Sequence, residues 1–250
     1  IRKGGNTGSA SANSRKISDQ SLKGLLSSLK NTIDSLNYKI STEDWTTYYS
    51  DNSYSSKAMV HKADLIKLWL SNGPRSKILL DLGGNAGKFS AIAANYADHV
   101  VLIDSDHDSV ELAARVFDSV PHPNVNCVVM DLTDPFVGGG WAGIERTSLF
   151  SRVQPDMCLA LALIHHIVIG AGIPMQRVAQ FMREITPNSI IEFVPPGDPM
   201  VELLISNKNG NHHSYSAETF ESSFKEYFQI ESKQALAESG RVLYQLGPKV

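Results

Sequence analysis

Short apolar runs alternate along this chain with segments in which apolar residues recur every three or four positions. Runs that are apolar at consecutive positions are typical of strands buried on both faces of a parallel sheet, and the segments between them have the period of amphipathic helices. The pattern therefore predicts an α/β domain whose most apolar run, 157–163, lies at the centre of the sheet. Its parallel strands are expected at 77–82, 99–104, 125–130, 157–163 and 189–194.

The last part of the chain has a different pattern, because two apolar runs there are separated only by a short turn at 238–240. We expect 228–234 and 241–246 to form a closing antiparallel hairpin. Helical periodicity predicts helices at 19–36, 56–71, 87–97, 106–120, 174–184, 200–205 and 217–227. Lys62, in the second of these helices, is expected on its solvated face.

The amino-terminal part is predicted to be a leader followed by a cap. Residues 1–18 are rich in Gly, Ser, Asn and basic residues with almost nothing to bury, which predicts a flexible leader. A polar segment between the first two helices carries the aromatic residues Trp45, Tyr48 and Tyr49. We expect residues 19–72 to form an N-terminal helical cap or lid that closes over a site, and ordinary core packing of the aromatic side chains is the alternative.

A glycine-rich turn follows the first predicted strand directly, since the chain reads Asp-Leu-Gly-Gly-Asn-Ala-Gly at 81–87 and then continues as a helix. A strand, a glycine turn and a helix in this order form the nucleotide site of an open α/β sheet. Gly83 and Gly87 would let a ligand approach the backbone, because a Cβ would collide with it. Asn85 stands where a third glycine is common, and Asn tolerates positive φ better than most residues.

An aspartate lies at or near the end of each of the first three predicted strands. These are Asp81, Asp104 and Asp131. An acid about twenty residues beyond the first strand commonly binds the hydroxyl groups of a ribose. Packing alone would not place three acids in this way, so the pattern predicts a nucleotide-type cofactor at this edge of the sheet.

The composition limits the kinds of binding partner and the cellular compartment that we expect for this protein. The chain has 250 residues, a net charge of −3 and two cysteines, Cys127 and Cys158, in predicted strands. This charge gives no electrostatic argument for a nucleic-acid partner, and the cysteines are expected to be inert core residues of a cytoplasmic protein. No apolar run reaches the ~20 residues that span a bilayer. Since the chain opens with Ile1 rather than Met, we expect it to be one domain of a larger protein.

These motifs resemble those of the class I S-adenosylmethionine-dependent methyltransferases over about residues 42–247. Residues 81–87 are similar to the first motif of that superfamily, acid-x-Gly-x-Gly-x-Gly, with a departure at Asn85. Within the superfamily the chain is most similar to a branch related to nodulation-associated methyltransferases. The residues that carry this closer resemblance are Trp45, Tyr48, Tyr49, Gly140, Trp141, Glu145, Arg146, 161–166 and 192–195.

The resemblance implies a Rossmann-like, mostly parallel seven-stranded sheet with the closing antiparallel hairpin, in a methyltransferase domain that spans 73–250. It implies S-adenosyl-L-methionine as the cofactor, with Asp104 on the ribose and Asp131 beside the adenine. The residues predicted to bind the cofactor are Asp81, Gly83, Gly84, Asn85, Ala86, Gly87, Asp104, Ser105, Asp131, Leu132 and Leu163.

Two histidines follow the central strand and are the candidate catalytic residues. Ligands of open α/β sheets bind where the strand order reverses, so we expect His165 or His166 to act as a general base or to orient the methyl acceptor. A buried histidine that only packs is the alternative. Glu192 is expected to serve catalysis with them and Asp198 to shape the substrate pocket, while Trp141 is expected either to cover the ligand or to anchor its own loop. Adjacent histidines rarely bind one ion together, so we predict no metal.

The sequence leaves the acceptor open. It has neither an Asn/Asp-Pro-Pro-Tyr motif after the fourth strand nor a Lys-Asp-Lys-Glu constellation. This favours an O or N atom of a small molecule, saccharide or carrier-bound intermediate over a carbon atom, RNA or protein. An NAD(P)-dependent oxidoreductase is the first alternative, although the turn lacks the full Gly-x-Gly-x-x-Gly phasing and Asp131 would have no role. A domain that binds a cofactor or a partner without turnover is the second.

Overall fold

The structure of this chain is a computed structural model that divides into two compact units, Ile1–Ile40 and Ser41–Val250. The residues that it describes are 17–36, 38–40, 55–119, 124–135, 138–207 and 214–249. Trp45, Tyr48 and Tyr49, predicted to form a lid, lie outside the described residues, as does most of the predicted leader.

The described part of the first unit is one helix, α1 (Asp19–Ser35), as predicted. Ser18 caps its amino end, because the Ser18 hydroxyl accepts a hydrogen bond from the backbone N–H of Ser21 at 3.1 Å. The second helix of the predicted cap, α3 (Ser56–Asn72), belongs to the second unit and packs there against the sheet. The two predicted cap helices therefore lie in different units.

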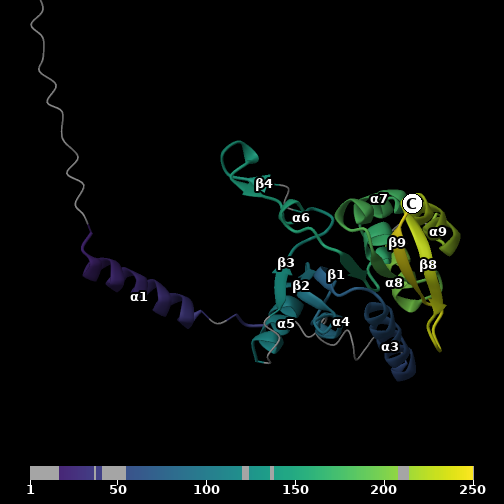
Figure 1. Cartoon of the computed structure of the whole chain (residues 1–250), viewed down its shortest axis with the longest axis horizontal. Coiled ribbons are helices and arrows are strands. Elements are labelled where there is room, and N and C mark those ends of the chain that lie inside the picture. The colour runs from purple at the N-terminus through teal and green to yellow at the C-terminus, as the bar shows by residue number, and fades with distance from the viewer. Residues whose placement is uncertain are drawn as a thin grey trace, which may run out of the picture. The chain divides into compact units, whose positions relative to one another are not determined.

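The second unit is built on a seven-stranded sheet, which confirms the predicted α/β fold (Figure 1). The strand order is β3-β2-β1-β6-β7-β9-β8, with β9 antiparallel to both of its neighbours and the other pairs parallel. The order reverses between β1 and β6, and β6 is central as predicted. The strands are β1 (Ser76–Leu82), β2 (Ala97–Asp104), β3 (Val125–Val129), β6 (Met157–Ala160), β7 (Ser189–Phe193), β8 (Phe228–Ala235) and β9 (Val242–Pro248).

The central strand and the helix after β1 are much shorter in the structure than the sequence pattern predicts. The central strand ends at Ala160 instead of continuing to 163, because Ala162 has a φ of 53° and cannot continue the ladder. The helix after β1, α4 (Lys88–Ala93), is also short, since Ala97 already pairs with Ser76 as the first residue of β2.

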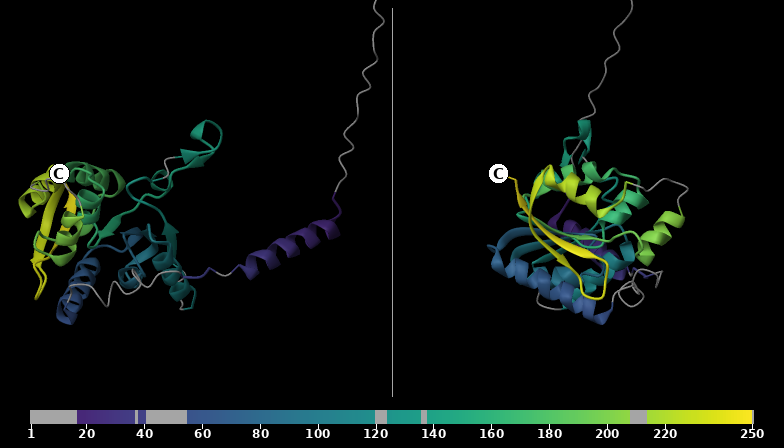
Figure 2. Two further views of the ribbon diagram at one scale, coloured as in Figure 1. Left: turned by 180° about the vertical axis from the view of Figure 1, so that it is seen from behind. Right: turned by 90° about the vertical axis from the view of Figure 1, so that its right-hand side faces the viewer.

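Helices cover both faces of the sheet (Figures 1 and 2). One face carries α3, α4 and α5 (His107–Ser119), and the other carries α7 (Met175–Ile185) and α9 (Ala217–Lys225). Side chains of β1 alternate between the two layers, because Leu79 packs in the cluster of α3 and α4 while Leu80 packs in that of α7 and α9. Both faces are therefore buried, as the consecutive apolar positions predict.

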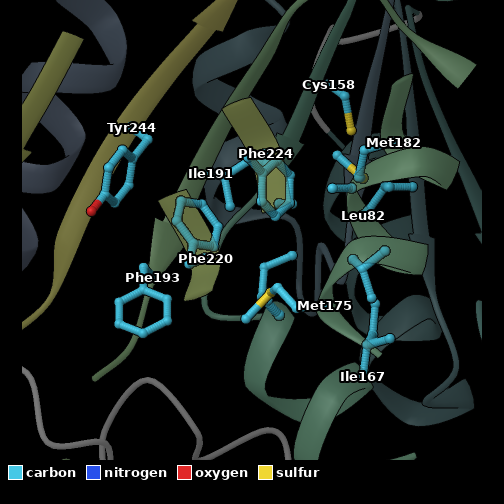
Figure 3. Packing of buried hydrophobic residues seen from close by; sticks show 14 of the residues in the cluster. Leu82, Cys158, Ile167, Met175, Met182, Ile191, Phe193, Phe220, Phe224 and Tyr244 are labelled. Atoms are coloured by element: carbon cyan, nitrogen blue, oxygen red, sulfur yellow. The ribbon is translucent and has the colours of Figure 1, made fainter. Parts of the chain in front are cut away.

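An aromatic cluster holds the closing hairpin in the core (Figure 3). The ring of Phe220, on α9, has its centroid 4.4 Å from that of Phe224 and 4.7 Å from that of Tyr244 on β9. Phe193, at the end of β7, lies 5.2 Å from Phe220 by the same measure. Because β9 is fixed in this way, Arg241, which directly precedes it, is held in the interior and is 1% exposed.

Candidate functional site

A cavity of about 260 Å³ lies at the carboxyl ends of β1, β2 and β6, where the strand order reverses. This is the place at which open α/β sheets bind ligands. All predicted cofactor residues except Ala86 and Gly87 lie on its wall, and His166 does so among the predicted catalytic residues. The wall consists of Lys62, Asp81, Gly83, Gly84, Asn85, Phe89, Asp104, Ser105, Met130, Asp131, Leu132, Thr133, Leu161, Ala162, Leu163, His166 and Ile167.

The glycine turn is tied to the neighbouring strand by its backbone. The N–H groups of Gly83 and Gly84 both donate to the carbonyl oxygen of Ile103, at 2.8 and 3.1 Å. Asn85 has a φ of 48°, which confirms the expected positive φ, and its side-chain Oδ1 accepts a hydrogen bond from the N–H of Ala86 at 2.7 Å. The turn is therefore held in one conformation on the cavity wall.

Protein packing also requires glycine in this turn, in addition to the expected approach of a ligand to Gly83 and Gly87. A Cβ at Gly87 would lie 2.7 Å from a ring carbon of Phe117 in α5, and φ there is +83°. A Cβ at Gly84 would lie 2.6 Å from Cγ of Leu102 in β2. Because neither glycine has a Cβ, the turn can pack directly against Leu102 of β2 and Phe117 of α5, and α4 begins there. At Gly83 a Cβ would meet Leu163, itself part of the cavity wall, at 3.1 Å.

Asp104 ends β2 at the cavity and fastens the glycine turn from the other side. Its Oδ2 accepts the N–H of Asn85 at 2.8 Å, and its Oδ1 accepts the N–H of Asp106 at 2.9 Å. Burial raises the pKa of Asp104, while these N–H donors act against the rise. Each carboxylate oxygen keeps a further lone pair, so Asp104 can also accept the hydroxyl groups of a ribose.

Asp131 lies beyond β3, on the exposed rim of the cavity. The Asp131 carboxylate accepts hydrogen bonds from the N–H and the hydroxyl of Thr133, at 2.8 and 2.7 Å, and these bonds lower its pKa. Together with Met130, Leu132 and Thr133 it forms a partly apolar wall. Met130 and Thr133 were not predicted, although both directly neighbour predicted residues in the chain.

Asp81, the first acid of the glycine motif, lies inside the domain and is 1% exposed. Its carboxylate accepts a hydrogen bond from the hydroxyl of Ser90, in α4, at 2.6 Å. Burial raises the pKa of Asp81 to about 6, although the bond from Ser90 and the charge of Lys62 oppose the rise. Asp81 thus changes its charge under mildly acidic conditions.

The prediction that Lys62 lies on a solvated helix face is wrong. Lys62 is 2% exposed and lies on the cavity wall. Its Nζ is 2.5 Å from Oε2 of Glu192 and 4.5 Å from the ring centroid of Phe89. Burial lowers its pKa, and Glu192 opposes that effect. The sequence could have indicated this burial, because Lys62 lies four residues from both Ala58 and Ile66. All three therefore share one face of the helix, and all three are buried.

A chain of buried charges continues from Lys62 away from the cavity. Arg241 approaches Glu192, with Nη1 3.6 Å from Oε1, and also binds Asp198, with Nε 2.7 Å from Oδ2 and Nη2 3.2 Å from Oδ1. Asp198 also caps α8 (Pro199–Ser206), because its Oδ1 accepts the N–H of Met200 at 3.0 Å. Glu192 and Asp198 are not among the residues that line the cavity, and both belong to this network of buried charges.

The two adjacent histidines have different surroundings. His166 begins η2 (His166–Gly170) and lies on the cavity wall, whereas His165 is 0% exposed and lies behind it. Neither ring nitrogen of His165 has a hydrogen-bond partner among the described residues, and its ring centroid is 4.2 Å from that of His166. Burial lowers the pKa of both, and of His165 far more strongly. His165 therefore packs as a core residue.

Trp141 does not reach the cavity. It is 82% exposed, in an excursion where β4 (Gly138–Gly139) pairs with β5 (Arg146–Thr147) and projects away from the main sheet (Figure 1). The N–H of Trp141 donates to Oε2 of Glu145 at 2.8 Å. The expectation that the Trp141 side chain covers the ligand therefore finds no support in this conformation.

Two further features limit the classes of site. Within the described residues, no group of three or more His, Cys, Asp and Glu side chains is arranged to hold a metal ion. Across the same residues, every helix is too short or too polar to span a membrane.

Comparison with known proteins links this geometry to a class of fold. No protein-family model matches the chain. The nodulation protein NoeA of Rhizobium meliloti (strain 1021) is 26% identical over 234 residues, which are 92% of this chain and 48% of NoeA. The chain thus spans about half the length of this relative.

Solved structures with similar folds include two methyltransferases. The N-methyltransferase NodS from Bradyrhizobium japonicum WM9, in complex with S-adenosyl-L-homocysteine, matches with a TM-score of 0.58 and 13% identity, over 84% of this chain and 95% of NodS. The magnesium protoporphyrin IX methyltransferase ChlM from Synechocystis PCC 6803, with the same bound molecule, matches with a TM-score of 0.56 and 15% identity, over 82% and 93% of the two chains. At these identities the similarity establishes a shared fold.

Proposed function

We propose that this chain, which has the fold of the class I S-adenosylmethionine-dependent methyltransferases, is itself a methyltransferase that uses S-adenosyl-L-methionine. The observation that carries the proposal is the meeting of three acids and the glycine turn on one cavity wall, at the reversal of strand order. Bound S-adenosylmethionine supplies an electrophilic methyl group. The residues of the chain have to bind this molecule, orient the acceptor and accept its proton.

Each part of the cofactor can be assigned to a different section of the cavity wall. Asp104 is proposed to accept the ribose hydroxyl groups. The partly apolar wall of Met130, Asp131, Leu132 and Thr133 is proposed to receive the adenine. The amino-acid end then belongs beside β1 and α3, away from the adenine wall.

At that end, Asp81 and Lys62 have the charges that complement an amino acid. The Asp81 carboxylate is proposed to attract the cofactor's ammonium group, and the Lys62 ammonium its carboxylate. Glu192 is proposed to act through Lys62, since it holds Nζ at 2.5 Å and does not line the cavity. It is therefore a positioning residue and not a catalytic one.

His166 is proposed to be the general base for an O or N acceptor. Burial and the charge of Arg241 lower its pKa, which keeps the imidazole neutral and able to accept a proton at neutral pH. A small molecule or carrier-bound acceptor is proposed, and the net charge of −3 gives no support to nucleic acid. Cys127 and Cys158 are both free thiols, which supports the proposal of a reducing cytoplasmic compartment.

Replacing Asp104 with alanine tests the proposed cofactor. Loss of hydrogen bonds to a charged group should weaken S-adenosylhomocysteine binding by about 1.5–3 kcal/mol, measured by calorimetric titration. Asp98→Ala is the matched control, because Asp98 lies at the other end of the same strand and pairs with Arg75 on the surface. Equal affinity in both variants, or binding of NADH by the wild type instead, would exclude this cofactor assignment.

The charge of Asp81 predicts how cofactor affinity changes with pH. Its pKa is raised from 3.8 to about 6, so the folded protein loses stability from this group as pH rises through 6 and Asp81 ionises in the interior. The cofactor's ammonium needs that ionised form. Affinity for S-adenosylhomocysteine should therefore fall as the pH is lowered from 7 to about 5, in a calorimetric series. Asp81→Asn should bind weakly throughout and lack this step; a step that persists in the variant would assign it to another group.

A further inference from the structure

The apolar face of α1 has a spacing that differs from that of an ordinary surface helix. Its apolar positions advance by steps of four, three, four and three, which is the seven-residue repeat of a coiled coil with a mean period of 3.5. The residues in these positions are Leu22, Leu26, Leu29 and Ile33 within the helix, and Leu36 directly after its last residue, Ser35.

This face has no partner among the described residues of its own unit, 17–36 and 38–40. Its side chains are between 46% and 72% exposed, and no residue of α1 is buried in the part of the chain that the structure describes. A single helix of this length is marginal in water, and Gly24 weakens it further. Figure 2 shows α1 as one uninterrupted helix, and the spacing of its apolar residues places them along one side of it. Such a face needs an occupant.

We propose that α1 pairs with α1 of a second copy of this chain, as a parallel two-stranded coiled coil. In the repeat, Leu26 and Ile33 take the a positions and Leu22 and Leu29 the d positions, while Leu36 stands at the next d position, directly after the end of the helix. Apolar a positions that include isoleucine, combined with leucine at every d position, are compatible with two parallel strands. Asp19, one repeat before Leu26, stabilises the first turn of the helix and marks the beginning of the apolar seam.

The charges beside the seam favour the parallel arrangement. Lys23 and Lys30 take the e positions, while Leu25 and Thr32 take the g positions. In a parallel pair each e position faces a g position of the partner, so the lysines meet neutral side chains, and the stem of a lysine can cover Leu25. In an antiparallel pair e faces e, and the lysines would repel one another. Lys30 also pairs with Asp34 along its own helix, on the outer side of the seam.

Cysteine cross-linking of the full chain tests both pairing and direction. In a parallel coil, position 29 lies opposite position 29 of the partner, so Leu29→Cys should form a disulfide-linked dimer under mild oxidation. Asn31→Cys, on the outer face of the same helix turn, is the matched control and should stay monomeric on a non-reducing gel. The wild type reports the background from half-buried Cys127 and buried Cys158. In an antiparallel coil an a position faces a d position, so a Leu22→Cys chain that links to an Ile33→Cys chain and not to another Leu22→Cys chain would overturn the parallel arrangement.

Light scattering of the unlinked protein gives the second measurement. The wild type should approach twice the 27.3 kDa of one chain as its concentration rises. Leu29→Lys should raise the dimer dissociation constant about tenfold or more, with an unchanged thermal unfolding midpoint of the sheet domain. A monomeric wild type would overturn the proposal, because α1 would then pack on its own chain or on a different protein. A dimer that Leu29→Lys leaves intact would place the interface elsewhere and overturn it as well.

Discussion

Replacing Glu192 with alanine is expected to lower the free energy of unfolding by about 3–5 kcal/mol. Glu192 is 0% exposed, and its two carboxylate oxygens face Lys62 at 2.5 Å and Arg241 at 3.6 Å. Without it, the buried ammonium of Lys62 loses the carboxylate that faces it at 2.5 Å, and Arg241 loses the nearby charge of Glu192 while it stays bound to Asp198. Urea unfolding followed by circular dichroism measures the loss.

Two further variants show whether the loss of stability in Glu192→Ala comes from the buried ion pairs or from the removal of any carboxylate. Glu111→Ala removes a carboxylate that pairs with Arg115 on the surface of α5, and should cost about 0.5 kcal/mol or less. The double variant Lys62→Met, Glu192→Gln removes both charges of the pair and leaves Arg241 bound to Asp198. It should lose less stability than Glu192→Ala, because no lysine charge remains buried. If Glu192→Ala lowered the free energy of unfolding by no more than Glu111→Ala does, the buried ion pairs of Glu192 would not stabilise the fold.

Replacing His166 with glutamine is expected to lower kcat by about 10²–10⁴-fold, because the acceptor loses its proposed general base. Affinity for S-adenosylhomocysteine should change little, since the proposed cofactor contacts lie on β1, β2, α3 and the segment after β3. Transfer of labelled methyl groups to the cell-extract fraction that the wild type methylates measures turnover, and calorimetry measures affinity. In the wild type, turnover should decline only below the ordinary histidine pKa of 6.5, because the pKa of His166 is lowered and its neutral form persists to lower pH.

His165→Leu is the matched control for this prediction. His165 is buried behind the cavity and its ring nitrogens have no hydrogen-bond partner among the described residues, so a leucine of similar size should keep turnover within about threefold. A loss of turnover in His165→Leu equal to that in His166→Gln would contradict the division of roles between the two histidines. Full activity of His166→Gln would remove the proposed base.

Much of the site was predictable because its parts are local. The run of apolar residues before Asp81 forms β1, and Asn85 takes the positive φ that its residue type tolerates. Asp104 ends β2 and Asp131 comes shortly after β3, and parallel strands bring such residues to one edge. Each inference needed only neighbouring residues and the rule that parallel strands share a direction.

The sequence did not predict which of the two adjacent histidines faces the cavity. A strand followed by His165 and His166 predicts that both approach the carboxyl edge, but adjacent residues on a helical turn point in different directions. The chain leaves β6 at Ala160, and Ala162 turns the backbone with a positive φ before η2 begins. That turn directs His166 to the cavity and His165 into the core, and no spacing in the sequence encodes the difference.

The sequence alone predicted the succession of strands and helices along the chain, the closing hairpin, and the glycine turn with its acids. These features were predictable because the spacing of apolar residues and the residue types of a turn act over only a few residues. The network of Lys62, Glu192, Arg241 and Asp198 required the folded chain. Its members lie in α3, in β7, at the N-cap of α8 and directly before β9. A lysine is normally solvated, and only the packing of α3 on the sheet, with a carboxylate placed opposite, makes its burial stable.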